Sequence, residues 1–242
     1  MFKGVSGKMG LILQRLYLKY MFLFPRISIL LSVYDTSFVL VKRAIDSVLR
    51  QDLQNFELIF IDDGSHAALA HEYADYVKLF PEKIKYLRHT NCGQSESINR
   101  GIAWSRGEYI TILDADDEFK PNHLSLCMAE MAFADLIASH TETVVDEEAD
   151  YYVPDRHDNS KVIHVDDCIL FATLFGKRQV FSQYSFNNTY AADARFYEQA
   201  AREYIVRKVD LRSYVYYRNI PGSICSVLKQ AKYKESMQAQ LS

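Results

Sequence analysis

Residues 107–117 have the sequence Gly-Glu-Tyr-Ile-Thr-Ile-Leu-Asp-Ala-Asp-Asp, and this stretch decides the fold that we predict. Its apolar first part, Tyr109 to Leu113, is typical of a buried strand. The strand ends in a group of carboxylates: Asp114, Asp116 and Asp117. Carboxylates gathered at one strand end repel one another unless a cation or a donor-rich ligand lies among them. The stretch therefore indicates a strand that leads into a binding site.

A second acidic strand end lies upstream. The mostly apolar run from Glu57 to Ile61 leads directly into Asp62-Asp63-Gly64-Ser65. If the two strands are parallel neighbours, their carboxyl ends meet at the edge where α/β sheets bind ligands. Carboxylate oxygens are hard ligands that suit Mg²⁺ or Mn²⁺ holding a diphosphate. We expect one acidic crevice built from both ends.

Strand and helix patterns alternate from Arg26 to about Ala134, which predicts an α/β fold with right-handed crossovers. The expected strands are 27–33, 58–61, 84–87 and 109–113, and the expected helices follow residues 37, 68, 93 and 120. After Ala138 the pattern changes. There we expect an acidic solvated loop at 141–158 (or a lid), helices through 168–174 and 193–204, and a strand at 213–217.

Composition limits the class of protein. The chain of 242 residues is 49% hydrophobic, 24% charged and 13% aromatic, which favours a folded domain over a disordered chain. Its net charge of −3 lacks the basic excess that a nucleic-acid-binding protein needs. The four cysteines form no Cys-x-x-Cys pair, so spacing predicts reduced thiols in a cytoplasmic protein rather than a zinc site.

We predict three segments along the chain. Residues 1–25 form a basic and apolar helical segment, 26–225 the main domain, and 226–242 a C-terminal tail. Arg15 and Lys19 interrupt the apolar run of the first segment, which argues against a transmembrane helix. Residues 1–24 could instead lie on the anionic inner face of the cell membrane, or pack on the domain or a second subunit.

Five fragments in order resemble the inverting GT-A glycosyltransferases of family 2, which implies their Rossmann-like fold with a mostly parallel central sheet flanked by helices. The fragments are Val33-Tyr34-Asp35, the helix 44–51, Asp62 to Ser65, the pair Asn91-Cys92-Gly93 with Asn99-Arg100-Gly101-Ile102, and residues 107–117. The resemblance is dense over 26–122, the nucleotide-sugar-binding half that it implies. It is loose over 123–225, which would be the acceptor and catalytic half.

The resemblance implies a role for each matched residue. Asp63 would contact the nucleotide base, with Tyr34 and Asp62 beside it. Asp116 and Asp114 would bind Mn²⁺ or Mg²⁺, and Asp117 would support the ribose or the donor sugar. The remaining residues implied in the nucleotide-sugar site are Asp35, Asn91, Gly93, Asn99 and Arg218.

Inverting transfer needs a base for the acceptor hydroxyl, which in this family is an aspartate at the start of a helix. Asp193 fits this place, although Ala192 stands where the family has a glutamate; Glu198 is the second candidate. Ile220 replaces a histidine that often assists the metal or diphosphate, which puts that contact in doubt.

The implied function is transfer of a sugar from a nucleotide-diphosphate sugar, by default a UDP-sugar, to an acceptor hydroxyl with inversion. The basic N-terminal segment suggests a glycan or lipid-linked glycan acceptor in surface polysaccharide synthesis. Two alternatives remain. Departures such as Ile220 suit a nucleotide-sugar-binding or scaffold subunit that has lost catalysis. A phosphatase built on Asp114 and Asp116 is disfavoured because Asp117-Glu118 replaces the Gly-Thr turn of that class.

Overall fold

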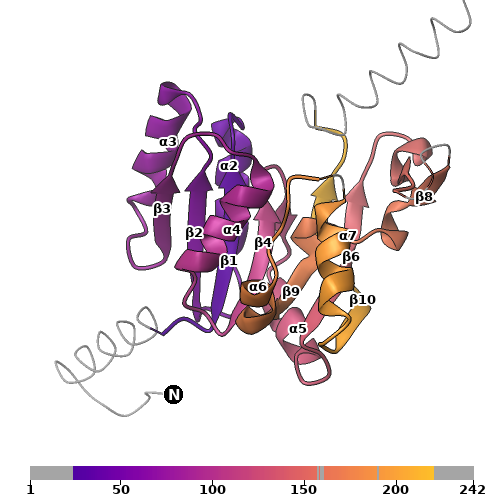
Figure 1. The fold of residues 1–242 in the computed structure, drawn as a ribbon. Helices are drawn as coiled ribbons and strands as arrows, with labels where there is room; N and C mark the ends of the chain where they lie inside the picture. The colour runs from indigo at the N-terminus through magenta and orange to yellow at the C-terminus, as the bar shows by residue number, and fades with distance from the viewer. Residues whose placement is uncertain (1–23, 157, 159–160, 190, 221–242) are drawn as a thin grey trace, which may run out of the picture.

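The computed structural model describes residues 24–156, 158, 161–189 and 191–220 (Figure 1). Its main feature is an eight-stranded sheet with the order β3-β2-β1-β4-β9-β6-β10-β5, beside a small two-stranded sheet, β7-β8. The strands are β1 (Ile27–Val33), β2 (Phe56–Asp62), β3 (Ile84–Arg88), β4 (Tyr109–Asp114), β5 (Glu118–Phe119), β6 (Leu136–Val144), β7 (Tyr152–Pro154), β8 (Val162–His164), β9 (Leu174–Lys177) and β10 (Val206–Tyr217). The predicted segments 1–25 and 226–242 lie, but for residues 24 and 25, outside the described residues.

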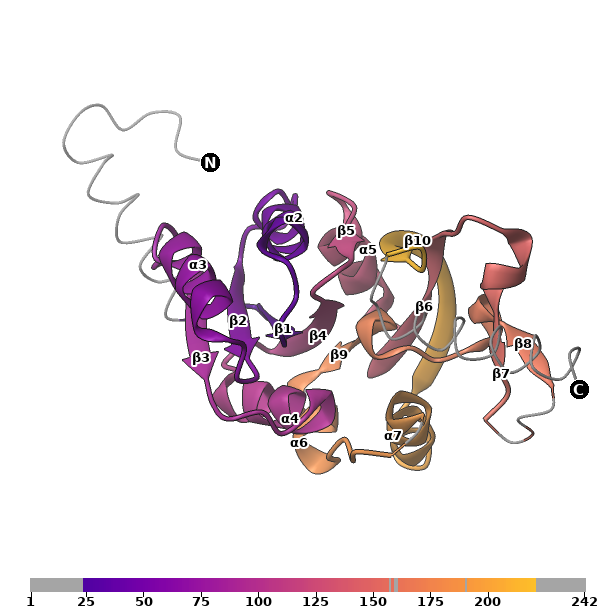
Figure 2. The same ribbon diagram turned by 90° about the horizontal axis from the view of Figure 1, so that it is seen from above.

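Helices cover both faces of the sheet (Figure 2). The α-helices are α2 (Phe38–Leu49), α3 (Ala67–Val77), α4 (Gln94–Trp104), α5 (His123–Glu130), α6 (Arg178–Gln183) and α7 (Ala192–Ala200); the 3₁₀ turns are η1 (Glu148–Tyr151), η2 (Val165–Asp167) and η3 (Phe171–Thr173). Helices α2, α3 and α5 contribute to one hydrophobic core, and α4, α6 and α7 to a second. No helix in the described ranges is long and apolar enough to cross a bilayer.

The first half of the sheet is parallel, as predicted. Strand β1 pairs with β2 on one side and β4 on the other, and β2 pairs with β3, all in parallel. Strands β1, β2 and β4 are nearly continuous apolar runs because helices bury both of their faces, whereas the edge strand β3 is only partly buried. The register sets Asp62 of β2 opposite Val33, and Asp114 of β4 opposite Ser32. The two acidic strand ends are therefore separated by a single strand.

The second half corrects two sequence expectations. The apolar residues at 168–174 form no helix: they lead through η3 into β9, which pairs antiparallel with β4 and β6. Leu174 and Phe175 pack into opposite cores, and a short strand buried on both faces has the same apolar run as a buried helix. The predicted loop at 141–158 is also partly strand, since β6 continues to Val144 and β7 begins at Tyr152.

Candidate active site

A cavity of about 680 Å³ opens at the carboxyl ends of β1, β2 and β4, where the sequence resemblance predicts the nucleotide-sugar donor, and after this prediction we call it the donor cavity. Its lining joins residues that are far apart in sequence. The sequence-predicted residues among them are Tyr34, Asp63, Asn91, Gly93, Asp114, Asp116 and Asp193. Both acidic strand ends therefore contribute a carboxylate to one space, which is the arrangement that the sequence predicted.

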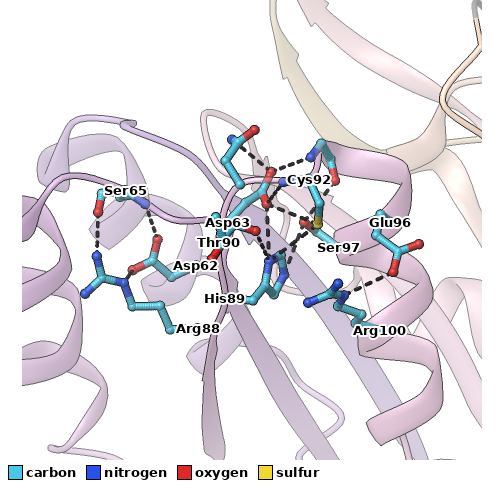
Figure 3. Close-up of polar contacts among 12 residues, drawn as sticks. Asp62, Asp63, Ser65, Arg88, His89, Thr90, Cys92, Glu96, Ser97 and Arg100 are labelled. Carbon is cyan, nitrogen blue, oxygen red and sulfur yellow. Dashed lines mark hydrogen bonds and ion pairs between the residues drawn. The ribbon is translucent and has the colours of Figure 1, made fainter.

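Asp63 is held at the end of β2 by the turn before α4 (Figure 3). Its Oδ1 accepts a hydrogen bond from the Cys92 backbone N–H at 2.7 Å, and its Oδ2 accepts one from Gly93 N–H at 2.9 Å. The amide of Asn91 donates to Oδ2 at 3.2 Å. Gly93 has φ of +90°, a conformation that glycine adopts without steric cost. The turn thus fixes the orientation of a carboxylate that lines the donor cavity.

Asp114 and Asp116 form the acidic pair after β4. The amide of Gln94 donates to Asp114 Oδ1 at 2.8 Å. Burial, followed by the negative charges of Asp116 and Asp193, raises the pKa of Asp114 to about 7. Burial also raises the pKa of Asp116, and the Arg43 guanidinium partly opposes this shift. Two neighbouring carboxylates, one of which raises the pKa of the other by its negative charge, are a fitting oxygen donor set for Mg²⁺ or Mn²⁺.

Asp117 lies behind this pair and binds protein groups. Its side chain is buried, with Oδ2 accepting from the Tyr214 hydroxyl and Oδ1 from the Tyr217 N–H, each at 2.8 Å. The same Tyr214 hydroxyl accepts from the Asp114 N–H at 3.2 Å. These contacts join the end of β4 to β10. Asp117 therefore stabilises the segment that carries the acidic pair, although it does not line the donor cavity.

A second cavity of about 1470 Å³ adjoins the first, and we call it the outer cavity. It is bordered by the β7-β8 hairpin, the segment before β9 and the start of α7. The two cavities share Gly93, Gln94, Leu170, Phe171, Asp193 and Tyr216. Asp193 therefore lies where the two spaces meet.

Helix α7 positions Asp193 in its first turn. The Asp193 carboxylate accepts hydrogen bonds from the Ala194 N–H at 2.8 Å and from the Phe171 N–H at 3.1 Å. Burial raises its pKa, although these backbone donors act in the opposite direction. A carboxylate with a raised pKa is a better proton acceptor near neutral pH.

Glu198 and Arg218 line only the outer cavity. Glu198 lies one turn further along α7, is 57% exposed and forms an ion pair with Arg156. Arg218 follows β10, and its guanidinium lies 5.8 Å from the Tyr216 ring centre. Glu198 is thus further from the donor cavity than Asp193 is. Arg218 lies beside Tyr216, which lines both cavities.

Asp62 lies beside Asp63 in sequence but outside both cavity linings. It is fully buried, and its carboxylate accepts from the Ser65 N–H at 2.8 Å and the Tyr86 hydroxyl at 2.7 Å. Arg88 forms an ion pair with it at 3.2 Å. Successive side chains in a strand point to opposite faces, so the end of β2 directs only Asp63 toward the donor cavity.

Asp35 and Asn99 also lie outside the two cavity linings. Asp35 Oδ1 accepts from the His66 N–H at 2.8 Å and so joins the ends of β1 and β2. Asn99 exchanges two hydrogen bonds with the Phe186 backbone, at 2.8 and 3.0 Å. Both side chains hold loops around the site.

Sequence reasoning missed three residues that shape the site. Gln94 binds Asp114, and Tyr214 joins Asp114 to Asp117. The Arg43 guanidinium donates to the Asp116 carbonyl and lies 3.9 Å from the centre of the Tyr217 ring. Gln94 follows the Asn-Cys-Gly turn directly and could have been found from that position. Arg43 and Tyr214 reach the site through tertiary packing that leaves no local signal.

Comparisons with known proteins agree with this architecture. The model of the glycosyl transferase family 2 matches residues 28–204. Glycosyltransferase GlyG of Streptococcus pneumoniae is 31% identical over 140 residues, which are 57% of this chain and 43% of GlyG. An uncharacterized glycosyltransferase of Rickettsia bellii is 36% identical over 127 residues, 52% of this chain and 18% of that protein. The chain thus matches less than half of the length of these relatives.

Two solved structures show the same fold. The mannosyltransferase PcManGT of Pyrobaculum calidifontis, in complex with GDP-Man and Mn²⁺, superposes with a TM-score of 0.64 at 15% identity, covering 87% of this chain and 65% of that one. Staphylococcus aureus TarS in complex with UDP-GlcNAc gives 0.63 at 16% identity, covering 83% and 60%. The curled, mostly parallel sheet flanked by helices is the GT-A fold. With a family match over more than half of its length, the chain belongs to glycosyl transferase family 2.

Proposed function

We propose that this chain transfers a sugar from a nucleotide-diphosphate sugar to an acceptor hydroxyl, with inversion at the anomeric carbon. The observation that carries the proposal is the position of Asp193 between two adjoining cavities, one of which contains both acidic strand ends. A donor in the first cavity and an acceptor in the second would meet beside this carboxylate.

The base end of the donor would lie against Asp63 and Tyr34. Asp63 is oriented by two backbone N–H groups and the Asn91 amide, and its Oδ1 retains an acceptor site for a base N–H. Tyr34 is 54% exposed and offers a ring for stacking. TarS structures hold UDP and UDP-GlcNAc, and the PcManGT structure holds GDP-Man; we propose a UDP-sugar as the default donor and a GDP-sugar as the first alternative in the screen.

The diphosphate would lie by Asp114 and Asp116. These carboxylates would hold Mn²⁺ or Mg²⁺, and the oxygen donor set fits either ion. The bound cation would neutralise the negative charge that develops on the leaving diphosphate. Gln94 fixes one carboxylate oxygen of Asp114, and Arg43 holds the backbone carbonyl of Asp116, so the Asp114 side chain and the Asp116 backbone are held in place before ligands bind.

Asp193 would take the proton of the acceptor hydroxyl. The N–H groups of Phe171 and Ala194 orient its carboxylate, and burial raises its affinity for a proton. Aromatic residues of the outer cavity, including Tyr152 and Tyr197, suit the apolar faces of a glycan acceptor. We further propose that the acceptor belongs to surface polysaccharide or lipid-linked glycan synthesis, at the inner face of a membrane reached through residues 1–24.

The experiment is a screen of nucleotide-sugars with and without Mn²⁺, first for thermal stabilisation and then for release of the nucleoside diphosphate in the presence of glycan acceptors. Transfer whose product has the inverted anomeric configuration supports the proposal. Donor binding without turnover on any acceptor would favour the scaffold alternative, and retained configuration would exclude the proposed mechanism. Liposome flotation with and without residues 1–24 tests the membrane contact separately.

A further inference from the structure

A second group of metal-ligating side chains lies at the edge of the donor cavity (Figure 3). Asp63 at the end of β2 meets His89 and Cys92 from the loop before α4, and one ligand atom of each lies within 4.8 Å of the others. The side chains of Asp63 and His89 are 5% and 12% exposed. The three ligands are of different types and are distinct from the acidic pair after β4.

The distances among the three ligand atoms are those of a tetrahedral zinc site. Asp63 Oδ1 lies 3.3 Å from His89 Nδ1, and Cys92 Sγ lies 3.5 Å from each of these atoms. With ordinary Zn–O, Zn–N and Zn–S lengths, a tetrahedron separates O from N by about 3.3 Å and S from either by about 3.5 Å. The three side chains therefore need little movement to hold the ion.

The surroundings hold the ligands in place. Gly93 N–H and the Asn91 amide bind the second oxygen of Asp63, so Oδ1 keeps a fixed direction. His89 Nε2 lies 3.5 Å from the Ser97 hydroxyl, on the side of the ring away from Nδ1. Without a metal, Nδ1 lies 2.9 Å from the Thr90 carbonyl, so binding requires the tautomer with its proton on Nε2. Outer contacts of this kind commonly orient metal ligands.

We propose that Asp63, His89 and Cys92 bind Zn²⁺, with water or another small ligand at the fourth position. Thiolate and imidazole ligands select zinc over the hard cations Mg²⁺ and Mn²⁺. The cysteine spacing had argued against a zinc site, because His-x-x-Cys supplies only two ligands and Asp63 comes from another strand. Zinc would occupy the carboxylate assigned above to the nucleotide base. We therefore expect zinc and the nucleoside part of the donor to exclude each other, an expectation that rests on the proposed function.

The test is titration with Co²⁺, a spectroscopic probe that shows a thiolate charge-transfer band only when sulfur binds it, followed by displacement with Zn²⁺. The wild type should show the band, and Cys92→Ser should abolish it. Zinc affinity should fall more than about 100-fold in Cys92→Ser and His89→Asn, since outer-sphere losses alone cost 10- to 100-fold. Cys168→Ser is the matched thiol control. Asp116→Asn tests whether the acidic pair contributes to Co²⁺ binding at this site. Both variants should keep the band.

Absence of the band in the wild type, or its survival in Cys92→Ser, would overturn the zinc site. Thermal unfolding of each variant separates lost binding from lost folding. Because these titrations contain no nucleotide, their failure would leave the proposed transferase function intact. Competition is then tested with the nucleoside of the stabilising donor, which lacks phosphates that chelate zinc. A band unaffected by a saturating nucleoside would refute mutual exclusion and the base-binding role of Asp63 while the zinc site stood.

Discussion

The carboxylate of Asp193 accepts a hydrogen bond from the Phe171 N–H at 3.1 Å, and both residues line the donor and outer cavities. Phe171 belongs to η3, the turn that leads into the central strand β9. The orientation of the proposed base, Asp193, therefore depends on the interior of the sheet. A substitution that keeps the size of the Asp193 side chain can separate its role as a base from its role in the structure.

Asp193→Asn should lower kcat by about 100-fold or more while the donor KM changes little, because an amide keeps the size of the side chain and one of its two acceptor oxygens but takes no proton. Steady-state kinetics with saturating metal measure both. Glu198→Gln is the matched control on the same helix and should stay within a few-fold of the wild type. The reverse ranking of the two variants would assign the base to Glu198.

Tyr214→Phe should lower the free energy of unfolding by about 1–3 kcal/mol, because the buried Asp117 carboxylate loses a donor and the Asp114 N–H loses an acceptor. Urea unfolding gives the value. The partly exposed Tyr152→Phe should change it by less than about 0.5 kcal/mol. Equal effects would show that the link beneath the acidic pair adds no stability.

His123 should make the protein less stable in mild acid. It is fully enclosed, stacks on Phe119, and burial lowers its pKa to about 3. Between pH 6.5 and 3, His123 binds a proton in the unfolded chain but not in the folded protein. The stability that neutral His123 contributes is therefore complete above pH 6.5 and falls as the pH drops.

Relative to His123→Asn, the wild type should therefore lose about 1.4 kcal/mol more stability between pH 7.5 and pH 5.5. Urea unfolding at both pH values measures the difference. Identical pH dependence in the two proteins would mean that His123 accepts a proton in the folded state.

Gly107→Ala should destabilise the protein more than Gly101→Ala. A Cβ on Gly107 would lie 2.5 Å from Ser28 N and 2.7 Å from Ile27 C, which are backbone atoms of β1. On Gly101 it would meet the movable ends of the Ile61 and Leu30 side chains, and alanine adds about 1 kcal/mol of helix propensity in α4. Thermal unfolding ranks the two variants, and a lower melting temperature for Gly101→Ala would contradict this packing.

The sequence predicted those parts of the site that local patterns determine. Alternating strands and helices, with carboxylates at two strand ends, were enough to place Asp63 near Asp116. They could not show which of Asp62 and Asp63 faces the cavity, because the direction of each side chain depends on the residue at which β2 ends. Nor could they identify β9 as a strand, because a short continuous apolar run has neither the helical nor the strand periodicity that would distinguish the two. Arg43 and Tyr214 enter the site through tertiary contacts, which a single sequence does not reveal.

Calorimetric titration of the stabilising nucleoside diphosphate, with Mn²⁺, into the wild type, Asp63→Ala and Asp116→Asn tests most directly whether the two strand ends form one nucleotide-sugar site. Both substitutions should weaken the same binding event by 10-fold or more, roughly the loss of one charge-assisted contact. Asp62→Asn, outside the cavity, should retain affinity if it folds. Undiminished binding in either cavity variant would contradict a shared site.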